Sequence, residues 1–160
     1  MLSIDIICVG RLKDKFFEEA AGEYLKRLKA YAKVNITEIK AVELPDDPNA
    51  SLISAALEKE GSEILKKIPS NAKVVTLCIE GKLFSSEDTA KLLSDTALSG
   101  CSEIVFIIGG SYGLSEQVKR CSDVRLSMSK MTFPHRLARI MLLEQIYRGF
   151  KINAGEKYHK

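Results

Sequence analysis

The sequence predicts a single α/β domain of three layers, with helices on both faces of a mostly parallel sheet. Segments of strand character alternate with segments of helical periodicity along the whole chain. The strands are continuous apolar runs, as expected when both faces of a sheet are covered. The 160 residues, 46% of them hydrophobic and 28% charged, are enough for one core, and no repeat or linker divides them. We therefore expect one domain over residues 1–160.

The first part of the chain predicts a strand, a helix and a second strand. Residues 4–9 form an apolar run rich in β-branched side chains, which predicts a buried strand. Apolar residues spaced three and four apart predict an amphipathic helix over residues 16–31. Alternating apolar and polar positions predict a second strand over residues 34–44, which the sequence PDDP at residues 45–48 ends in a turn.

The middle of the chain repeats this alternation. Asn49 is suited to cap a helix that extends to Leu65, although a glycine at position 61 disfavours helix in its middle. Residues 74–79 and 104–108 are apolar runs that predict buried strands. Between them, Ser-Ser-Glu-Asp resembles a capping box and predicts a helix over residues 85–98.

The last third of the chain predicts two short elements and one long one. A short helix is expected over residues 115–121 and a short strand over residues 124–128. Pro134 suits the first position of a helix, and the last helix is predicted to extend to about Phe150. That helix is apolar on nearly all sides, so we expect it to be buried, against its own subunit or against a second copy.

Positive charge gathers at the C-terminal end. Residues 1–127 hold 17 Lys and Arg against 19 Asp and Glu, whereas residues 128–160 hold 7 against 2, so all of the net charge of +3 comes from the last fifth of the chain. A local basic surface suits a phosphate-rich partner, and a solvated basic tail is the plain alternative.

The number and spacing of the cysteines and histidines, and the lengths of the apolar runs, argue against metalloproteins, disulfide-rich proteins and membrane proteins. The cysteines are far apart and form no C-x-x-C pair, and only two histidines are present, so we expect no metal site and no disulfide framework. No stretch approaches the ~20 apolar residues of a membrane span, and the N-terminus lacks the basic region of a signal peptide. The sequence predicts a cytoplasmic protein with no membrane contact.

Ligands of parallel sheets bind beyond the carboxyl ends of the strands, and four loops lie there. The loop GGSYG at residues 109–113 has the most glycine, which suits either a ligand loop with bare N–H groups or a tight steric turn. A dinucleotide-binding plan is excluded because the first strand ends in Val-Gly-Arg with one glycine, and no P-loop or nucleophile elbow is present. The remaining loops are at residues 10–11, 80–82 and 127–133.

Several motifs together resemble the RlmH family of SPOUT-class methyltransferases. They are IDIICVGRLK, VVTLCIEGKLFSSE, IIGGSYGLS, LSMSKMTFPHRLARIMLLEQIYRGFKI and the terminal EKYHK, which cover essentially the whole chain in order. The resemblance implies a C-terminal trefoil knot, S-adenosylmethionine as cofactor and a homodimer. It also implies methylation of N3 of a pseudouridine in helix 69 of 23S ribosomal RNA, on the assembled ribosome.

The resemblance also implies a cofactor site. Leu77 would line the adenine pocket, and Gly109 with Gly110 would contact the cofactor by backbone. The loop that wraps the adenosine would consist of Met128, Ser129, Lys130, Met131, Thr132 and Phe133. Leucine, methionine and phenylalanine side chains suit the apolar slot that adenine needs.

The basic C-terminal segment supplies the candidates for the substrate side. Tyr158 and His159 suit stacking on an RNA base and contact with phosphate, so we expect them to face the substrate. His135 and Arg139, at the start of the last helix, are further catalytic candidates, and His135 also suits a structural place at the helix start. The alternatives to this enzyme are a SPOUT methyltransferase for another RNA, such as tRNA, and a ribosome-binding module without catalysis.

Overall fold

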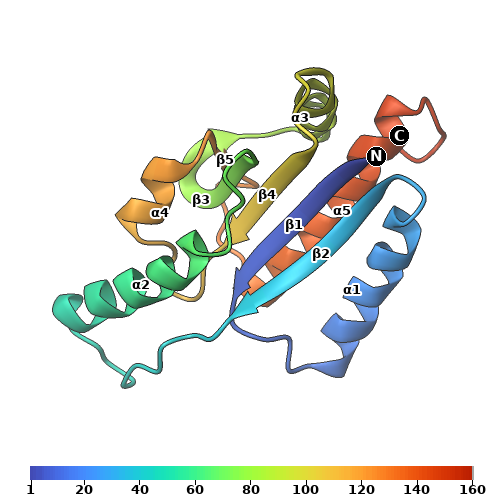
Figure 1. Ribbon diagram of the computed structural model, residues 1–160. Coiled ribbons are helices and arrows are strands. Elements are labelled where there is room, and N and C mark those ends of the chain that lie inside the picture. The colour runs from blue at the N-terminus through green and yellow to red at the C-terminus, as the bar shows by residue number, and fades with distance from the viewer. Residues whose placement is uncertain (160) are drawn as a thin grey trace.

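A five-stranded sheet in the order β2-β1-β4-β3-β5 forms the centre of the protein (Figure 1). The computed structural model describes residues 1–159, and within them every strand pairing is parallel. The strands are β1 (Leu2–Val9), β2 (Ala32–Ile39), β3 (Lys73–Leu83), β4 (Glu103–Ile108) and β5 (Val124–Ser127). The helices are α1 (Lys15–Leu28), α2 (Ala50–Leu65), α3 (Ser86–Leu98), α4 (Glu116–Cys121) and α5 (His135–Asn153). The predicted α/β fold with a parallel sheet is confirmed, and Lys160, the last residue of the predicted domain, lies outside the described residues.

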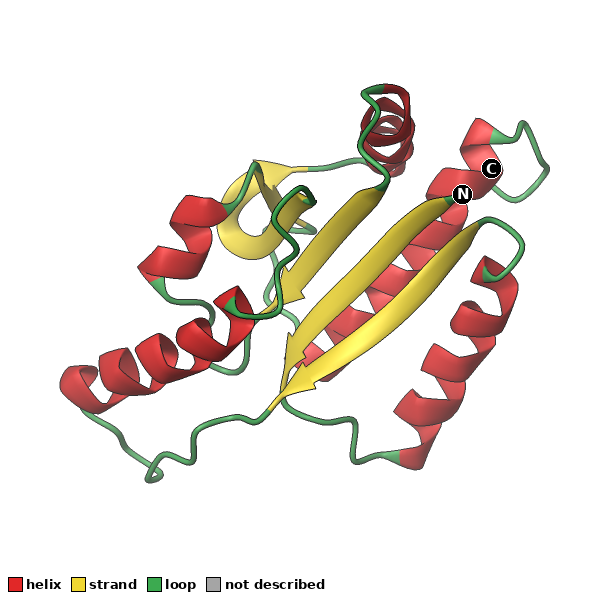
Figure 2. Ribbon diagram, in the orientation of Figure 1, coloured by secondary structure: helices red, strands yellow, loops and turns green. Residues whose placement is uncertain are grey.

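Helices cover both faces of the sheet (Figure 2). Successive side chains of a strand point to opposite faces, and the two halves of the core follow this rule. Ile4 and Ile6 of β1 pack into the cluster that holds residues of α1, α3 and α5. Ile7 and Val9 pack into the other cluster, with residues of α2 and α4. The three predicted layers are therefore present.

Several element boundaries differ from the prediction by a few residues, and two of the differences have a clear local reason. The predicted strand over residues 34–44 ends at Ile39, because its neighbour β1 ends opposite it at Val9 and beyond that point no strand is left to pair with. Residues 40–44 are not part of the sheet. Within them, Val42 N–H donates to a carboxylate oxygen of Glu60 at 2.9 Å instead of to a neighbouring strand. Pro134 is the residue before α5 rather than its first helical residue, because its ψ of 142° is extended.

The glycine that disfavoured a helix over residues 49–65 has a packing role. Helix α2 is continuous through Gly61, which is buried. A Cβ atom at this position would lie 2.4 Å from Ser115 Oγ, and Ser115 is the residue that caps α4. Only a residue without a side chain lets these two helices approach so closely, so packing outweighs the low helix propensity of glycine.

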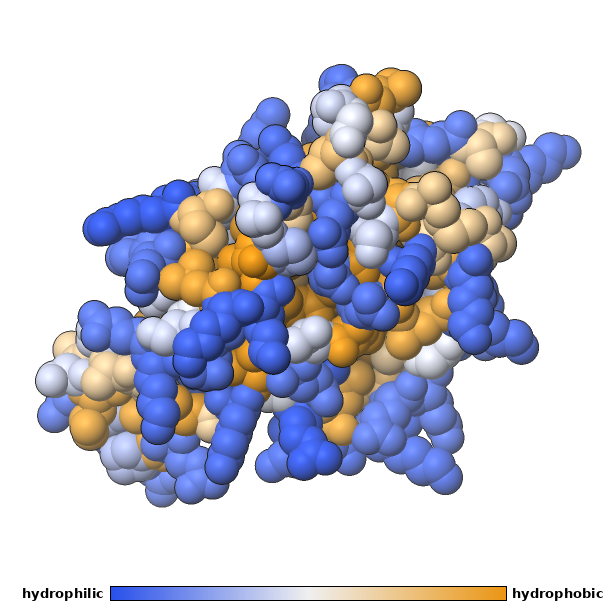
Figure 3. All heavy atoms as spheres, viewed as in Figure 1, coloured by the Kyte–Doolittle hydropathy of each residue, from blue (hydrophilic) through white to orange (hydrophobic). Residues whose placement is uncertain are grey.

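The last helix packs against its own chain. Helix α5 contacts α1 and α3 on one face of the sheet, and its Leu142, Leu143 and Ile146 are buried there. Within residues 1–159, no helix is both long and apolar enough to cross a membrane. The face seen in Figure 3 carries mostly hydrophilic side chains around its rim, with apolar side chains in the middle.

Candidate functional site

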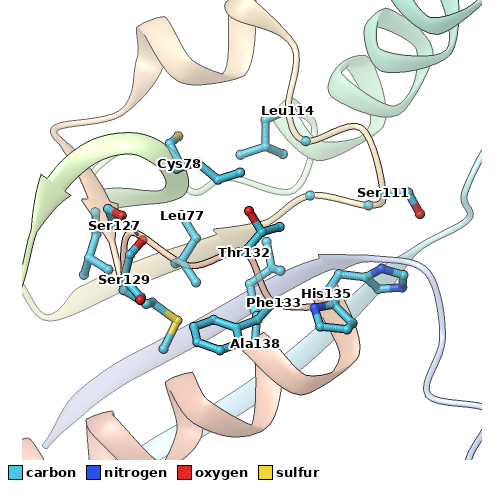
Figure 4. A pocket seen from close by; sticks show the side chains of 18 of the residues that line it. Leu77, Cys78, Ser111, Leu114, Ser127, Ser129, Thr132, Phe133, His135 and Ala138 are labelled. Atoms are coloured by element: carbon cyan, nitrogen blue, oxygen red, sulfur yellow. Dashed lines mark hydrogen bonds between the residues drawn. The ribbon is translucent and has the colours of Figure 1, made fainter.

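A pocket of about 840 Å³ lies at the carboxyl ends of β3, β4 and β5 and reaches the start of α5. This volume is in the range of small-molecule sites, and the position is the one expected for ligands of parallel sheets. Figure 4 shows Leu77, Thr132 and Phe133 in the middle of the pocket, with Ser111 and His135 toward one end. The structure thus brings together loops that are far apart in the sequence.

The turn at residues 109–113 forms one wall of this pocket, and its glycines are needed to build it. Gly113 has a φ of +84°, the left-handed region that glycine adopts without strain. A Cβ on Gly109 would lie 2.4 Å from the carbonyl oxygen of Gly113, whereas a Cβ on Gly110 would touch only Val9, at 3.4 Å. The steric and the ligand interpretations of GGSYG are therefore compatible, because the tight turn also lines the pocket.

The opposite wall comes from the loop between β5 and α5. Met128, Ser129, Met131, Thr132 and Phe133 all line the pocket, while Lys130 is exposed on the outside of the same loop. Hydrogen bonds fix the loop shape: Ser127 Oγ donates to the carbonyl of Ser129, and Met131 N–H donates to Ser129 Oγ, both at 3.0 Å. The loop is thus shaped by its own side chains.

An irregularity in β3 opens the third side of the pocket. Leu77 and Lys82 both lie opposite Leu126 of β5, so the residues between them leave the ladder. Glu80, in this excursion, pairs with Lys119 of α4 at 2.5 Å. The hydrogen bond with Lys119 lowers the pKa of Glu80, and the same bond raises the pKa of Lys119. Both residues line the pocket, which therefore contains a fixed ion pair.

The two candidates at the start of α5 have different surroundings. His135 lines the pocket beside Gly10. Arg139 is only 3% exposed and lies behind the pocket, where its guanidinium donates to Glu38 Oε2 at 3.0 Å and to the carbonyl of Gly10 at 3.1 Å. In this chain Arg139 therefore joins α5 to the ends of β1 and β2.

The C-terminal candidates lie at the other end of α5. The ring of Tyr158 packs edge-on against Tyr147, 4.9 Å between centroids, and Arg148 lies over it at 4.6 Å. His159 Nε2 lies 2.8 Å from a carboxylate oxygen of Glu87. The Tyr158 hydroxyl donates to Glu144 at 3.2 Å, so the tail folds back along the second half of α5. Glu144 is nine residues from His135, which is ~14 Å along the helix at 1.5 Å per residue.

Comparison with known proteins identifies the family. A family model described as a predicted SPOUT methyltransferase matches residues 2–159. The chain belongs to the SPOUT methyltransferase family. The resemblance that the sequence motifs carry is thereby confirmed.

Relatives within the SPOUT methyltransferases match over their full length. The chain is 49% identical to "Ribosomal RNA large subunit methyltransferase H" of Clostridium novyi, over 99% of this chain and 100% of that one. It is 48% identical to the protein of the same name from Pelotomaculum thermopropionicum, over 99% of each chain. A "Putative ribosomal RNA large subunit methyltransferase H" of Methanococcus maripaludis is also 48% identical, over 99% of this chain and 100% of that one.

The pocket of this SPOUT methyltransferase fits the cofactor that the family implies. Its lining offers an apolar slot from Leu77, Leu126 and Phe133 beside a glycine turn that a Cβ would fill at Gly109. An adenosine needs such a slot together with exposed backbone donors and acceptors.

Within residues 1–159, no three His, Cys, Asp or Glu side chains are grouped to hold a metal ion. Burial raises the pKa of the Cys8 thiol to about 11, which leaves it unreactive.

Sequence reasoning missed part of the lining. Lys119, Leu114 and Ile108 line the pocket, although sequence patterns place them only in elements around the glycine turn. Glu80 lies in a loop that is a candidate through its position at a strand end, but nothing in the sequence pairs it with Lys119. Helix α4 begins only three residues after the glycine turn in the sequence. This short separation is the one feature of the sequence from which Lys119 could have been expected near the same ligand.

His135 is expected to make stability dependent on pH. Burial lowers its pKa from the ordinary 6.5, and the nearby Arg136 and Arg139 lower it further. The folded protein then binds fewer protons than the unfolded chain, so stability should fall as the pH falls through and below about 6.5. Thermal unfolding at about pH 7.5 and about pH 5.5 should show a smaller loss of Tm for His135→Gln than for the wild type. Equal losses in the two proteins would contradict a depressed pKa.

Proposed function

We propose that this protein transfers a methyl group from S-adenosylmethionine to large-subunit ribosomal RNA. The observation that carries the proposal is the full-length identity of 48–49% to relatives named as ribosomal RNA large subunit methyltransferases. The more specific target, N3 of a pseudouridine in helix 69 of 23S RNA in the assembled ribosome, follows from the motif resemblance. The site of action is then the cytoplasm, where ribosomes are found.

The pocket residues would hold and orient the cofactor. Leu77 and Phe133 supply apolar walls for adenine, and the backbone of Gly109 and Gly110 can approach it closely. The bound cofactor supplies a methyl group already activated by its sulfonium, so the protein's main contribution is position. Orientation of two bound reactants can supply ~7–11 kcal/mol of the barrier.

The substrate side needs a group that accepts or stabilises charge on the imide. His135 lies in the pocket with a lowered pKa, so its neutral form, which can accept a proton, predominates at neutral pH. Arg136 also lines the pocket and suits contact with a phosphate or a developing negative charge. Both residues are at the start of α5, next to the glycine turn.

We propose that the protein acts as a homodimer in which one chain's tail completes the other chain's pocket. Tyr158 and His159 bind Glu144 and Glu87, which do not line the pocket of their own chain, so a second copy is the simplest way for them to face its substrate. Helix α5 leaves Leu137 36% exposed beside the pocket, and Met131 of the facing loop is 72% exposed. Apolar side chains exposed around a pocket mouth suit such a contact.

The trefoil knot is part of this proposal. Helix α5 follows β5, at the edge of the sheet, yet it packs against α1 and α3, which precede it in the chain. A C-terminal helix that returns to earlier helices in this way is the arrangement that we expect of a trefoil knot. An experimental structure tests this part of the proposal. The knot is supported if the traced backbone stays entangled when its two ends are drawn apart, and contradicted if it becomes a straight line.

The decisive experiment is mass spectrometry of ribosomal RNA from cells that lack this protein. The proposal expects one pseudouridine of the large subunit to lose its methyl group, and the purified protein with S-adenosylmethionine to restore it on isolated ribosomes. Loss of a methyl from tRNA instead would show a different RNA substrate. If calorimetry detects no heat of binding for S-adenosylmethionine, the protein is a ribosome-binding module without catalysis.

Complementation between two inactive variants tests the shared site. Gly109→Ala damages the pocket and His159→Ala damages the tail, so each homodimer is expected to be nearly inactive. Random mixing gives heterodimers with one intact pocket facing one intact tail, and activity should return to about one quarter of the wild type. The measurement is methyl transfer to ribosomes after the variants are co-expressed. No recovery, with heterodimers verified by two different affinity tags, would show that the tail acts within its own chain or not at all.

A further inference from the structure

The loop between β1 and α1, together with the first residue of α1, presents three cations next to the start of α5. Arg11, Lys13 and Lys15 are exposed, whereas the residues between them, Leu12 and Asp14, are only partly exposed. This alternation gives the segment one outward and one inward side, as in an extended chain. Leu12 packs against the core that lies under α1 and α5. The three positive charges therefore point away from the body of the protein.

The inward side of the loop is tied to the start of α5. Asp14 precedes α1 but makes no capping hydrogen bond, and its carboxylate instead receives a bond from Arg136 at 3.1 Å. Leu12 N–H donates to Glu38 Oε2 at 3.3 Å, and the same carboxylate binds Arg139. An aspartate that would otherwise cap its helix thus serves to hold the loop at the pocket.

An exposed aromatic ring completes the surface. Phe16, in the first turn of α1, is 65% exposed, and its ring lies 4.4 Å from that of Phe17 between centroids. Gly10, which precedes Arg11, lies against His135, and Arg136, which binds Asp14 among the cations, lines the pocket. An exposed apolar ring among cations, in a segment tied to the pocket lining through Arg136, is the combination that binds single-stranded nucleic acid by stacking and by phosphate contact.

We propose that Arg11, Lys13, Lys15 and Phe16 form an RNA-docking surface that holds the strand flanking the target base at the pocket. The cations would neutralise backbone phosphates and Phe16 would stack on an unpaired base next to the target. Because the loop is held in place by Asp14 and Glu38, it loses little conformational freedom on binding. This proposal rests on the proposed function, because it assigns a second RNA contact to the same site.

The test is the salt dependence of binding to unmethylated ribosomes, purified from cells that lack this protein. The triple variant Arg11→Gln, Lys13→Gln, Lys15→Gln is compared with Lys33→Gln, Lys59→Gln, Lys67→Gln, which removes the same charge from exposed positions on other parts of the chain. Each phosphate contact to a single strand contributes about 0.7 to the slope of log K against log salt, so the docking variant should lower the slope by about 2 and the affinity by roughly 10–100-fold. Phe16→Leu should weaken binding roughly 5-fold or more and leave the slope unchanged.

The outcomes separate this proposal from the proposed function. Unchanged S-adenosylmethionine affinity with a lower slope in the docking variant supports it. A docking variant that behaves like its charge-matched control, while the wild type methylates ribosomes, overturns the docking surface alone. A loss of affinity with an unchanged slope overturns it in favour of contact with a ribosomal protein, because such a contact releases no condensed counterions. Failure of the wild type to methylate ribosomes overturns the proposed function itself.

Discussion

Replacing Gly109 by alanine is expected to weaken cofactor binding strongly, although it adds a single methyl group. The new Cβ would lie 2.4 Å from the carbonyl oxygen of Gly113 and 2.5 Å from its carbonyl carbon, so the turn must open. The atoms of Gly113 that the Cβ would meet are all backbone, and they cannot rotate away as a flexible side chain can. A displacement of about 1 Å in a site that works by positioning costs on the order of 100-fold, and the overpacked turn should cost about 1–3 kcal/mol of stability.

Two other glycine-to-alanine changes provide matched controls for this experiment. Gly22 lies in α1, and the position that a Cβ would take there has no atom of another residue within 4 Å, so Gly22→Ala should leave binding unchanged and raise stability by up to ~1 kcal/mol. Gly110 lines the same pocket but a Cβ there meets only ordinary contact with Val9, so Gly110→Ala should reduce affinity far less. Calorimetry with S-adenosylmethionine and thermal unfolding measure both effects. Wild-type affinity in Gly109→Ala would contradict the tight turn as a pocket wall.

Removing Glu38 is expected to destabilise the protein more than removing its partner Arg139. The side chain of Arg139 is 4% exposed and that of Glu38 is 38% exposed. Glu38→Ala leaves a buried guanidinium without its counter-charge and Leu12 N–H without its acceptor. Because Glu38 is partly exposed, the cost should be about 2–4 kcal/mol, less than for a fully buried pair. Arg139→Met fills the same space with an apolar chain and leaves a carboxylate that water can reach, so we expect a cost of about 1–3 kcal/mol.

The measurement is the free energy of unfolding from urea titration. Glu19→Ala, which removes an exposed carboxylate from α1, is the control and should stay within about 0.5 kcal/mol of the wild type. The larger effect of Glu38→Ala should be accompanied by weaker cofactor binding, because Glu38 and Arg139 hold the loop beside His135. An equal or larger effect of Arg139→Met would mean that the arginine acts through its packing and its bond to Gly10 rather than through the pair.

The alternation of strands and helices is predictable because burial imposes a period on the sequence. Runs such as residues 104–108 are apolar throughout because α-helices cover both faces of β4. Ser85 caps α3 where the capping-box pattern predicts it, since capping depends on residues three positions apart. Predicted boundaries are wrong where a partner decides them, as at Ile39, beyond which β1 offers no further pairing.

The candidate site is predictable in part. The loops at residues 109–113 and 128–133 are candidates because parallel sheets place ligands at their carboxyl ends, and family resemblance supplies the cofactor. The structure places both loops on one pocket. It also gives Arg139 a partner 101 residues away in Glu38, and it packs Tyr158 and His159 against Glu144 and Glu87, outside the pocket. No periodic pattern carries such information.

The sequence by itself determined the order and type of the elements, the position of the glycine turn and the family. Those properties depend on local spacing and on motifs, which can be read without coordinates. Only the tertiary structure decided that the turn is tight because Gly109 meets Gly113, that Glu80 pairs with Lys119, and that Asp14 binds Arg136 instead of capping α1. Such contacts join residues far apart in the chain or depend on distances of a few tenths of an ångström, and packing of the whole domain sets both.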